Sequence, residues 1–127
     1  MSEKKAVRVV EDAPQNLDMI GEMLEGDYLV LKAEGIVAGY SLFQEHCEQI
    51  QAILMDGDMP PGPPEMRTTV DLVRMIRRDG FSGMIIAISG DNEQQEKLCA
   101  PGLCDYKLAK PFRRARLLEL LHQTSSA

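Results

Sequence analysis

Residues 52–56 read AILMD, a run of four apolar residues that ends in an aspartate. A short, wholly apolar run of this kind is typical of a strand that other elements cover on both faces. Two further runs resemble it, because AVRVVED at residues 6–12 ends in two acids and KPF at residues 110–112 follows a mostly apolar stretch. Functional sites of α/β sheets lie at the carboxyl ends of the strands. We therefore expect the charged residues of the three runs to meet at one edge of a sheet.

Apolar runs bounded by polar turns recur along the chain with the spacing of alternating strands and helices. Five such units in succession predict a doubly wound α/β fold, in which a parallel sheet carries helices on both faces. The predicted strands are residues 6–10, 28–33, 52–55, 84–88 and 104–108.

Helices are predicted from apolar side chains at three- and four-residue spacing. Pro14 suits a first helical turn. The crowded prolines of residues 60–64 are expected to exclude regular structure until a helix resumes at about Met66, and Gly80 is a predicted stop. Residues 92–99 form a predicted helix of unusual polarity. The predicted inward faces are Leu17, Ile20 and Leu24; Ala38, Leu42 and Phe43, ending near Cys47; Leu72, Val73 and Ile76; and Leu117, Leu118 and Leu121, with fraying over residues 124–126.

The composition is that of a globular domain, with 44% hydrophobic and 27% charged residues. We expect one domain over residues 1–127, with an ordered core over about residues 5–122. The net charge of −6 argues against binding to nucleic acids or to anionic membranes. No apolar stretch approaches the ~20 residues of a membrane span, and the opening residues MSEKK lack the apolar core of a secretion signal. Three cysteines in apolar contexts fit reduced thiols, so a cytoplasmic protein is expected.

The acidic residues indicate a metal site only when they are considered together. Glu11 and Asp12 follow a predicted strand and precede a helix, where an acidic pair is more often a helix cap than a metal site. Asp56 could likewise be a cap. Neighbouring parallel strands would nevertheless bring all three carboxylates to one edge, where they repel unless a cation neutralises them. Hard oxygen ligands favour Mg²⁺ or Mn²⁺.

Ser89 and Lys110 follow the fourth and fifth predicted strands. Serine is a common turn residue, and a lysine just past a strand is usually solvated. Beside the acidic group, however, the Ser89 hydroxyl could donate to a phosphoryl oxygen and Lys110 could supply a point charge to it. The proline that follows Lys110 biases the lysine toward extended backbone.

Four fragments in this order resemble the receiver domain of two-component response regulators. They are EDAPQN at residues 11–16, MDGDMP at 55–60, IAISG at 86–90 and KPF at 110–112. The resemblance covers essentially the whole chain, and the first fragment is most similar to receivers of hybrid sensor kinases. It implies a flavodoxin-like sheet with strand order 2-1-3-4-5.

The resemblance implies a phosphorelay switch in which Asp56 is the nucleophile that takes a phosphoryl group from a phosphohistidine. Asp12 and Asp56 would ligate Mg²⁺ directly, together with the backbone carbonyl of Asp58, and Glu11 would act mostly through bound water. Such transfer needs an in-line nucleophile and neutralised equatorial charge, which a metal and a lysine supply. The protein would catalyse only its own phosphorylation and dephosphorylation, so an enzyme in the ordinary sense is not expected.

The same resemblance assigns Ser89 and Lys110 to the phosphoryl oxygens and Tyr106 to the switch aromatic of the fifth strand. A cis bond before Pro111 would aim Lys110 back toward the nucleophile. The chain departs from the family in that Tyr106 lies four residues before Lys110 instead of three. Either Lys107 therefore takes the switch position or the fifth strand carries a bulge. The proline loop is also longer than usual and lacks the common Asp-Gly turn.

The partners implied are a histidine kinase or a histidine phosphotransfer protein and an unknown downstream protein. No nucleic acid and no membrane insertion are expected, and the protein would be a monomer or a weak dimer.

Two alternatives belong to other classes. The segment from Asp56 to Asp58 is similar to the Asp-x-Asp motif of haloacid-dehalogenase-like phosphatases, in which the first aspartate is the nucleophile and the second the general acid and base. That motif normally ends the first strand of a larger domain, whereas here two β/α units precede it. The other alternative is a degenerate receiver that binds partners without phosphorylation, which the complete set of acids, serine and lysine disfavours.

Overall fold

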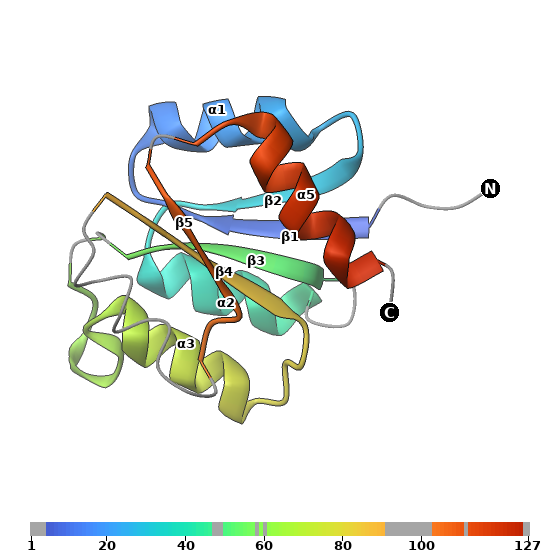
Figure 1. The fold of residues 1–127 in the computed structure, drawn as a ribbon. Coiled ribbons are helices and arrows are strands. Elements are labelled where there is room, and N and C mark those ends of the chain that lie inside the picture. Colours follow the sequence, from blue (N-terminus) through green and yellow to red (C-terminus); the bar gives the residue numbers. More distant parts are fainter. Residues whose placement is uncertain are drawn as a thin grey trace.

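Five parallel strands form one sheet in the order β2-β1-β3-β4-β5 (Figure 1). This order confirms the predicted doubly wound α/β fold. The computed structural model describes residues 5–46, 50–57, 59, 61–90, 103–110 and 112–125. The strands are β1 (Lys5–Val10), β2 (Tyr28–Ala33), β3 (Ile50–Asp56), β4 (Met84–Ser89) and β5 (Tyr106–Ala109).

The strands end close together, and this positions the site. In the register of the sheet the last pairs are Val10 with Met55, Asp56 with Ile88, and Ser89 with Ala109. The residues that follow β1, β3, β4 and β5 therefore emerge at the same edge.

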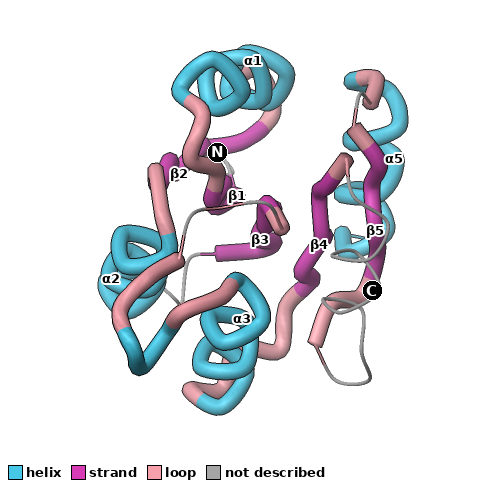
Figure 2. The backbone as a smooth tube through the Cα atoms, turned by 90° about the vertical axis from the view of Figure 1, so that its left-hand side faces the viewer, coloured by secondary structure: helices cyan, strands magenta, loops and turns pink. Residues whose placement is uncertain are grey.

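Within the described residues, two helices cover each face of the sheet (Figures 1 and 2). On one face lie α1 (Pro14–Leu24) and α5 (Arg114–Ser125), and on the other lie α2 (Ile36–His46) and α3 (Thr69–Arg78). Each pair of helices buries its own apolar cluster against the strands, so the sheet is sandwiched between two cores. No helix in the described part of the chain is both long and apolar enough to span a membrane.

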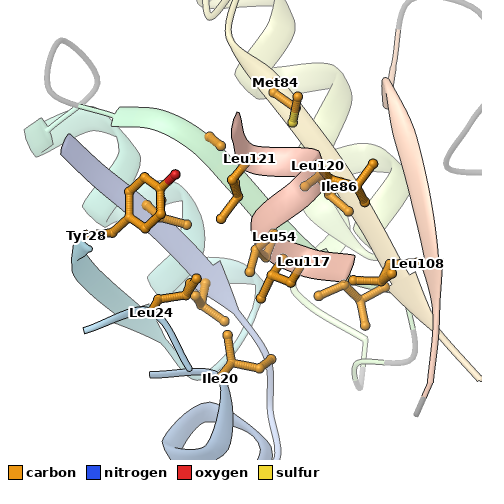
Figure 3. Close-up of a cluster of buried hydrophobic side chains, with 14 of the residues drawn as sticks. Ile20, Leu24, Tyr28, Leu54, Met84, Ile86, Leu108, Leu117, Leu120 and Leu121 are labelled. Atoms are coloured by element: carbon orange, nitrogen blue, oxygen red, sulfur yellow. The ribbon is translucent and has the colours of Figure 1, made fainter. Parts of the chain in front are cut away.

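The core beneath α1 and α5 follows the predicted helix faces closely (Figure 3). Leu24 of α1 and Leu117 of α5 are fully buried and lie in one cluster with Leu54 of β3. The α5 face differs by one position, because Leu120 is 1% exposed whereas Leu118 is only partly buried. The helix also continues to Ser125 instead of fraying at residue 124.

The opposite core confirms Leu72, Val73 and Ile76 of α3 as buried residues. The prediction for α2 was wrong at Ala38, which is exposed, while Gly39 at the next position is buried. The side chains of Leu42 and Phe43, also predicted to face inward, lie outside the described part of the chain. A Cβ atom on Gly39 would lie 3.0 Å from Cγ1 of Val10, so the helix approaches the strand through its smallest residue. A search for large apolar side chains cannot find such a contact.

The proline loop contains more regular structure than the sequence predicted. A single 3-10 turn, η1 (Pro64–Met66), forms inside it, with Pro64 in the first position that a helix tolerates. The α-helix starts later, at Thr69, because Thr68 and Asp71 form a capping box. Gly80 follows the end of α3 with a φ of 102°, as expected for a stop signal.

The fifth strand starts two residues later than predicted. Just before β5, the Asp105 side chain accepts a hydrogen bond from the backbone N–H of Ile85 at 2.9 Å. Its own backbone N–H donates to the Ile85 carbonyl. The predicted helix over residues 92–99 lies outside the described residues.

Candidate functional site

The three predicted acids lie together at the carboxyl edge of the sheet. Glu11 follows β1 directly and is 2% exposed, and its backbone N–H donates to the Ala33 carbonyl of β2. Asp56 is the last residue of β3 and is 1% exposed, and Asp12 is half-buried. One carboxylate oxygen from each of the three acids lies within 4.8 Å of the others. The sequence prediction of an acidic cluster is therefore met in the structure.

Lys110 adds a positive charge to this acidic cluster. Its Nζ atom lies 3.3 Å from Oε2 of Glu11 and 3.3 Å from Oδ1 of Asp56. Its backbone N–H donates to the Ser89 carbonyl, which ties the lysine to the end of β4. Burial alone lowers the pKa of the Lys110 ammonium, but Asp56 and then Glu11 outweigh it, so the pKa lies above its ordinary value.

Ser89 lies at the same edge, as the last residue of β4 and 1% exposed. Since Ile88 pairs with Asp56, Ser89 is one position beyond the aspartate on the neighbouring strand. The structure thus brings Ser89 into the same neighbourhood as the acids and Lys110.

Tyr106 and Lys107 lie on opposite faces of β5. Tyr106 pairs with Ile86 and packs against the core beneath α1 and α5, whereas Lys107 pairs with Ala87 and is exposed. Side chains alternate along a strand, so Ser89 shares its face with Ala87 and Lys107. The register of β4 with β5 is continuous over the described pairs, so these pairs carry no bulge, and the residue at the switch position stays a prediction. Tyr106 and Ser89 are not brought together.

Two residues that contact the cluster were not predicted from the sequence. The side-chain amide of Asn16 in α1 donates to Oε1 of Glu11 at 2.9 Å. Asn16 belongs to the fragment EDAPQN, and its place five residues after Glu11 was the available signal. The hydroxyl of Thr69 donates to the backbone carbonyl of Asp56 at 3.0 Å. No sequence signal connects these two residues, because the proline loop separates them.

Two predicted features lie outside the described residues. They are the backbone carbonyl of Asp58 as a metal ligand, and the cis bond before Pro111.

The donor set fits a small divalent cation. Counting Glu11, Asp12, Asp56 and Lys110, three carboxylates face one ammonium, which leaves an excess of negative charge when all are ionised. Buried like charges repel strongly at this separation. Carboxylate oxygens are the ligands that Mg²⁺ and Mn²⁺ prefer, so a cation at this cluster would relieve the repulsion.

The sequence matches no protein-family model and no curated protein. Solved structures are nevertheless similar over nearly the whole chain. A response regulator receiver domain protein from Clostridium thermocellum is 23% identical, with a TM-score of 0.83 over 94% of this chain and 93% of that one. The chemotaxis protein CheY4 of Vibrio cholerae is 20% identical, with a TM-score of 0.80 over 96% and 99%.

A CheY-like receiver domain protein from Methanospirillum hungatei is 21% identical, with a TM-score of 0.77 over 98% of each chain. The chain therefore has the fold of response regulator receiver domains. The narrower similarity to receivers of hybrid sensor kinases stays a prediction.

Proposed function

We propose that this protein is a phosphoryl-accepting switch of a phosphorelay, with Asp56 as the acceptor. The observation that carries the proposal is the position of Asp56: a buried carboxylate at the end of β3, 3.3 Å from the Lys110 ammonium and within 4.8 Å of two further carboxylates. The receiver fold supports it, because this edge is where α/β folds keep their sites.

In the proposed reaction a carboxylate oxygen of Asp56 attacks the phosphorus atom of a phosphohistidine. A P–O bond forms as the P–N bond breaks, and the electron pair of that bond stays with the departing imidazole nitrogen. Lys110 sets a positive charge beside the nucleophile, and the Ser89 hydroxyl would donate to a phosphoryl oxygen. Glu11, Asp12 and Asp56 would hold Mg²⁺ or Mn²⁺, which neutralises phosphoryl charge when bound.

The donor would be a histidine kinase or a histidine phosphotransfer protein, in the cytoplasm, and the phosphorylated face would bind a downstream protein. We propose no turnover of other substrates, so the chemistry is confined to phosphorylation and hydrolysis of Asp56 itself.

Intact-mass measurement after incubation with Mg²⁺ and acetyl phosphate tests the proposal. The wild-type protein is expected to gain one phosphoryl group, and Asp56→Asn none. Asp27→Asn, an exposed aspartate on another part of the surface, is the matched control and should label normally. Equal labelling of Asp56→Asn would contradict the assignment of the acceptor.

Labelling of neither the wild type nor the variants would favour the degenerate receiver. Continuous turnover of a generic phosphate ester, lost in Asp58→Asn, would favour the phosphatase.

A further inference from the structure

The peptide unit between Asp56 and Gly57 is held from both sides. The N–H of Gly57 donates to the Ile88 carbonyl of β4 at 2.9 Å. The carbonyl of Asp56 accepts from the Thr69 hydroxyl at 3.0 Å. Because a peptide unit is a rigid plane, bonds on both edges fix its rotation. They thereby fix the direction in which the Asp56 side chain leaves the backbone.

The hydrogen bond from Thr69 lies at the end of β3, just beyond the last pair of β1 with β3. The pairing of β1 with β3 ends at Val10 and Met55, and the N–H of the next residue, Glu11, donates to the Ala33 carbonyl of β2. The Asp56 carbonyl is thus beyond the last β1–β3 pair, in a residue that is 1% exposed. Buried carbonyls require a donor, and Thr69 brings one from the opposite side of the proline loop.

Thr69 is itself held rigidly. It is the first residue of α3 and is 5% exposed. The preceding Thr68 accepts from the Asp71 N–H, and the Asp71 carboxylate accepts in turn from the backbone N–H groups of Arg67 and Thr68. The proline loop is closed by a bond from the Gly62 N–H to the Arg67 carbonyl. These hydrogen bonds therefore fix the backbone of Thr69 and, with it, the position from which its hydroxyl donates.

Resting on the function proposed above, we infer that Thr69 is the positioning residue of the phosphoacceptor. Its hydroxyl clamps the Asp56–Gly57 peptide so that the Asp56 carboxylate faces Lys110 and the acidic pair. Thr69 touches neither the phosphoryl donor nor a metal ligand's side chain in this scheme. Small displacements of a reacting group by about 1 Å can cost about 100-fold in rate, so loss of the clamp should slow transfer.

Three variants of the full chain separate this role from simple stabilisation. Thr69→Val keeps the shape of the side chain and removes the hydroxyl. Thr69→Ser keeps the hydroxyl. Val73→Ala is the matched control, because it removes buried side-chain atoms from α3 and keeps both the Thr69 hydroxyl and the cap that holds it.

The measurement is the rate of labelling by acetyl phosphate at saturating Mg²⁺, as a function of donor concentration. Thr69→Val is expected to lower the maximal rate about tenfold or more, with the half-saturating donor concentration unchanged. Thr69→Ser and Val73→Ala should stay within about threefold of the wild type, although Val73→Ala unfolds more easily.

A wild-type labelling rate in Thr69→Val overturns the inference, as does equal slowing in Val73→Ala or in Thr69→Ser. If the wild-type chain does not label at all, the proposed function fails separately. Mg²⁺ affinity, measured calorimetrically on the same four proteins, then decides the role of Thr69. A weaker affinity confined to Thr69→Val supports the clamp, and four equal affinities overturn it.

Discussion

Two charged clusters lie at opposite ends of the sheet and differ in how completely their charges are satisfied. At the carboxyl ends of the strands, three carboxylates lie together and two of them, Glu11 and Asp56, contact Lys110. At the amino ends of β4 and β5, Arg77 of α3 donates through Nε and both terminal nitrogens to four acceptors. These are the carbonyls of Leu103, Phe81 and Gly83 and the carboxylate of Asp105. We call this second group the Arg77 clasp.

This difference distinguishes charged groups that stabilise the fold from charged groups of the kind expected in a functional site. The Arg77 side chain is 19% exposed and has a partner on each nitrogen, and the more exposed Asp105 also accepts from Ile85. A polar network whose groups all have partners stabilises and specifies a fold. A cluster with excess charge instead costs stability until a ligand arrives, which is typical of a functional site.

The largest expected effect tests the structural side of this comparison. Arg77→Ala would remove the donor that serves three backbone carbonyls and one of the two donors to the Asp105 carboxylate, so the free energy of unfolding should fall by about 2–4 kcal/mol. Arg74→Ala removes an exposed arginine from the same helix and should change it by no more than about 0.5 kcal/mol. Urea unfolding measures both. Equal values for the two variants would mean that the clasp is not structural.

The two clusters also differ in how far the sequence predicted them. The acidic cluster was predictable, because strand topology alone brings residues that follow apolar runs to one edge. Glu11 and Asp56 needed no knowledge of the loops. The Arg77 clasp depends on where α3 ends and how the chain enters β4 and β5. Nothing in the spacing of Arg77 and Asp105, 28 residues apart, indicated their contact.

The same reason explains the other errors. Strand interiors follow from apolar runs, but β5 starts two residues later than predicted, after a residue whose side chain, not its carbonyl, accepts from the Ile85 N–H. Ala38 was wrongly placed on the inward face of α2 because a glycine, not a larger apolar residue, lies against Val10 of β1. The clamp from Thr69 was invisible because it bridges the proline loop. Contacts set by loop paths and by small residues leave no periodic signal.

A smaller effect tests the charge excess. Mg²⁺ at about ten times its dissociation constant should raise the free energy of unfolding by about 1.4 kcal/mol through mass action. Arg77→Ala should show the same increment as the wild type, since distant sites act additively. Asp12→Ala should lose the increment and, by relieving repulsion, gain roughly 1 kcal/mol without metal.

Thermal melting with and without Mg²⁺ measures these changes. Glu22→Ala, which removes an exposed acid from α1, is the matched control and should keep the increment. An unchanged melting midpoint of the wild type in Mg²⁺ would count against a metal site, and an equal increment in Asp12→Ala would place the metal elsewhere.

The smallest expected effect is a pH dependence that the acidic cluster has and the Arg77 clasp lacks. The folded protein raises the pKa of Lys110 above its ordinary value of 10.5, because Asp56 and Glu11 outweigh the opposing effect of burial. The folded state thus binds this proton more tightly than the unfolded state. The stabilisation by Lys110 is complete below pH 10.5 and is lost as the pH rises through the folded pKa. Arginine stays protonated throughout this range.

Urea unfolding at several pH values between about 9.5 and 11.5 should therefore show the wild type losing its advantage over Lys110→Met as the pH rises. Burial and Asp27 also raise the pKa of Tyr28, but that contribution is common to both proteins and cancels in the difference. Lys107→Met is the matched control: Lys107 is exposed on β5, so its difference in free energy of unfolding from the wild type should not change with pH.

A pH-independent difference for Lys110→Met would mean that this lysine does not stabilise the acids, and the contrast between the two clusters would then rest on Arg77 alone. A falling difference assigns the alkaline sensitivity to the ion pairs of Lys110 with Glu11 and Asp56, the contacts that phosphorylation of Asp56 would alter first.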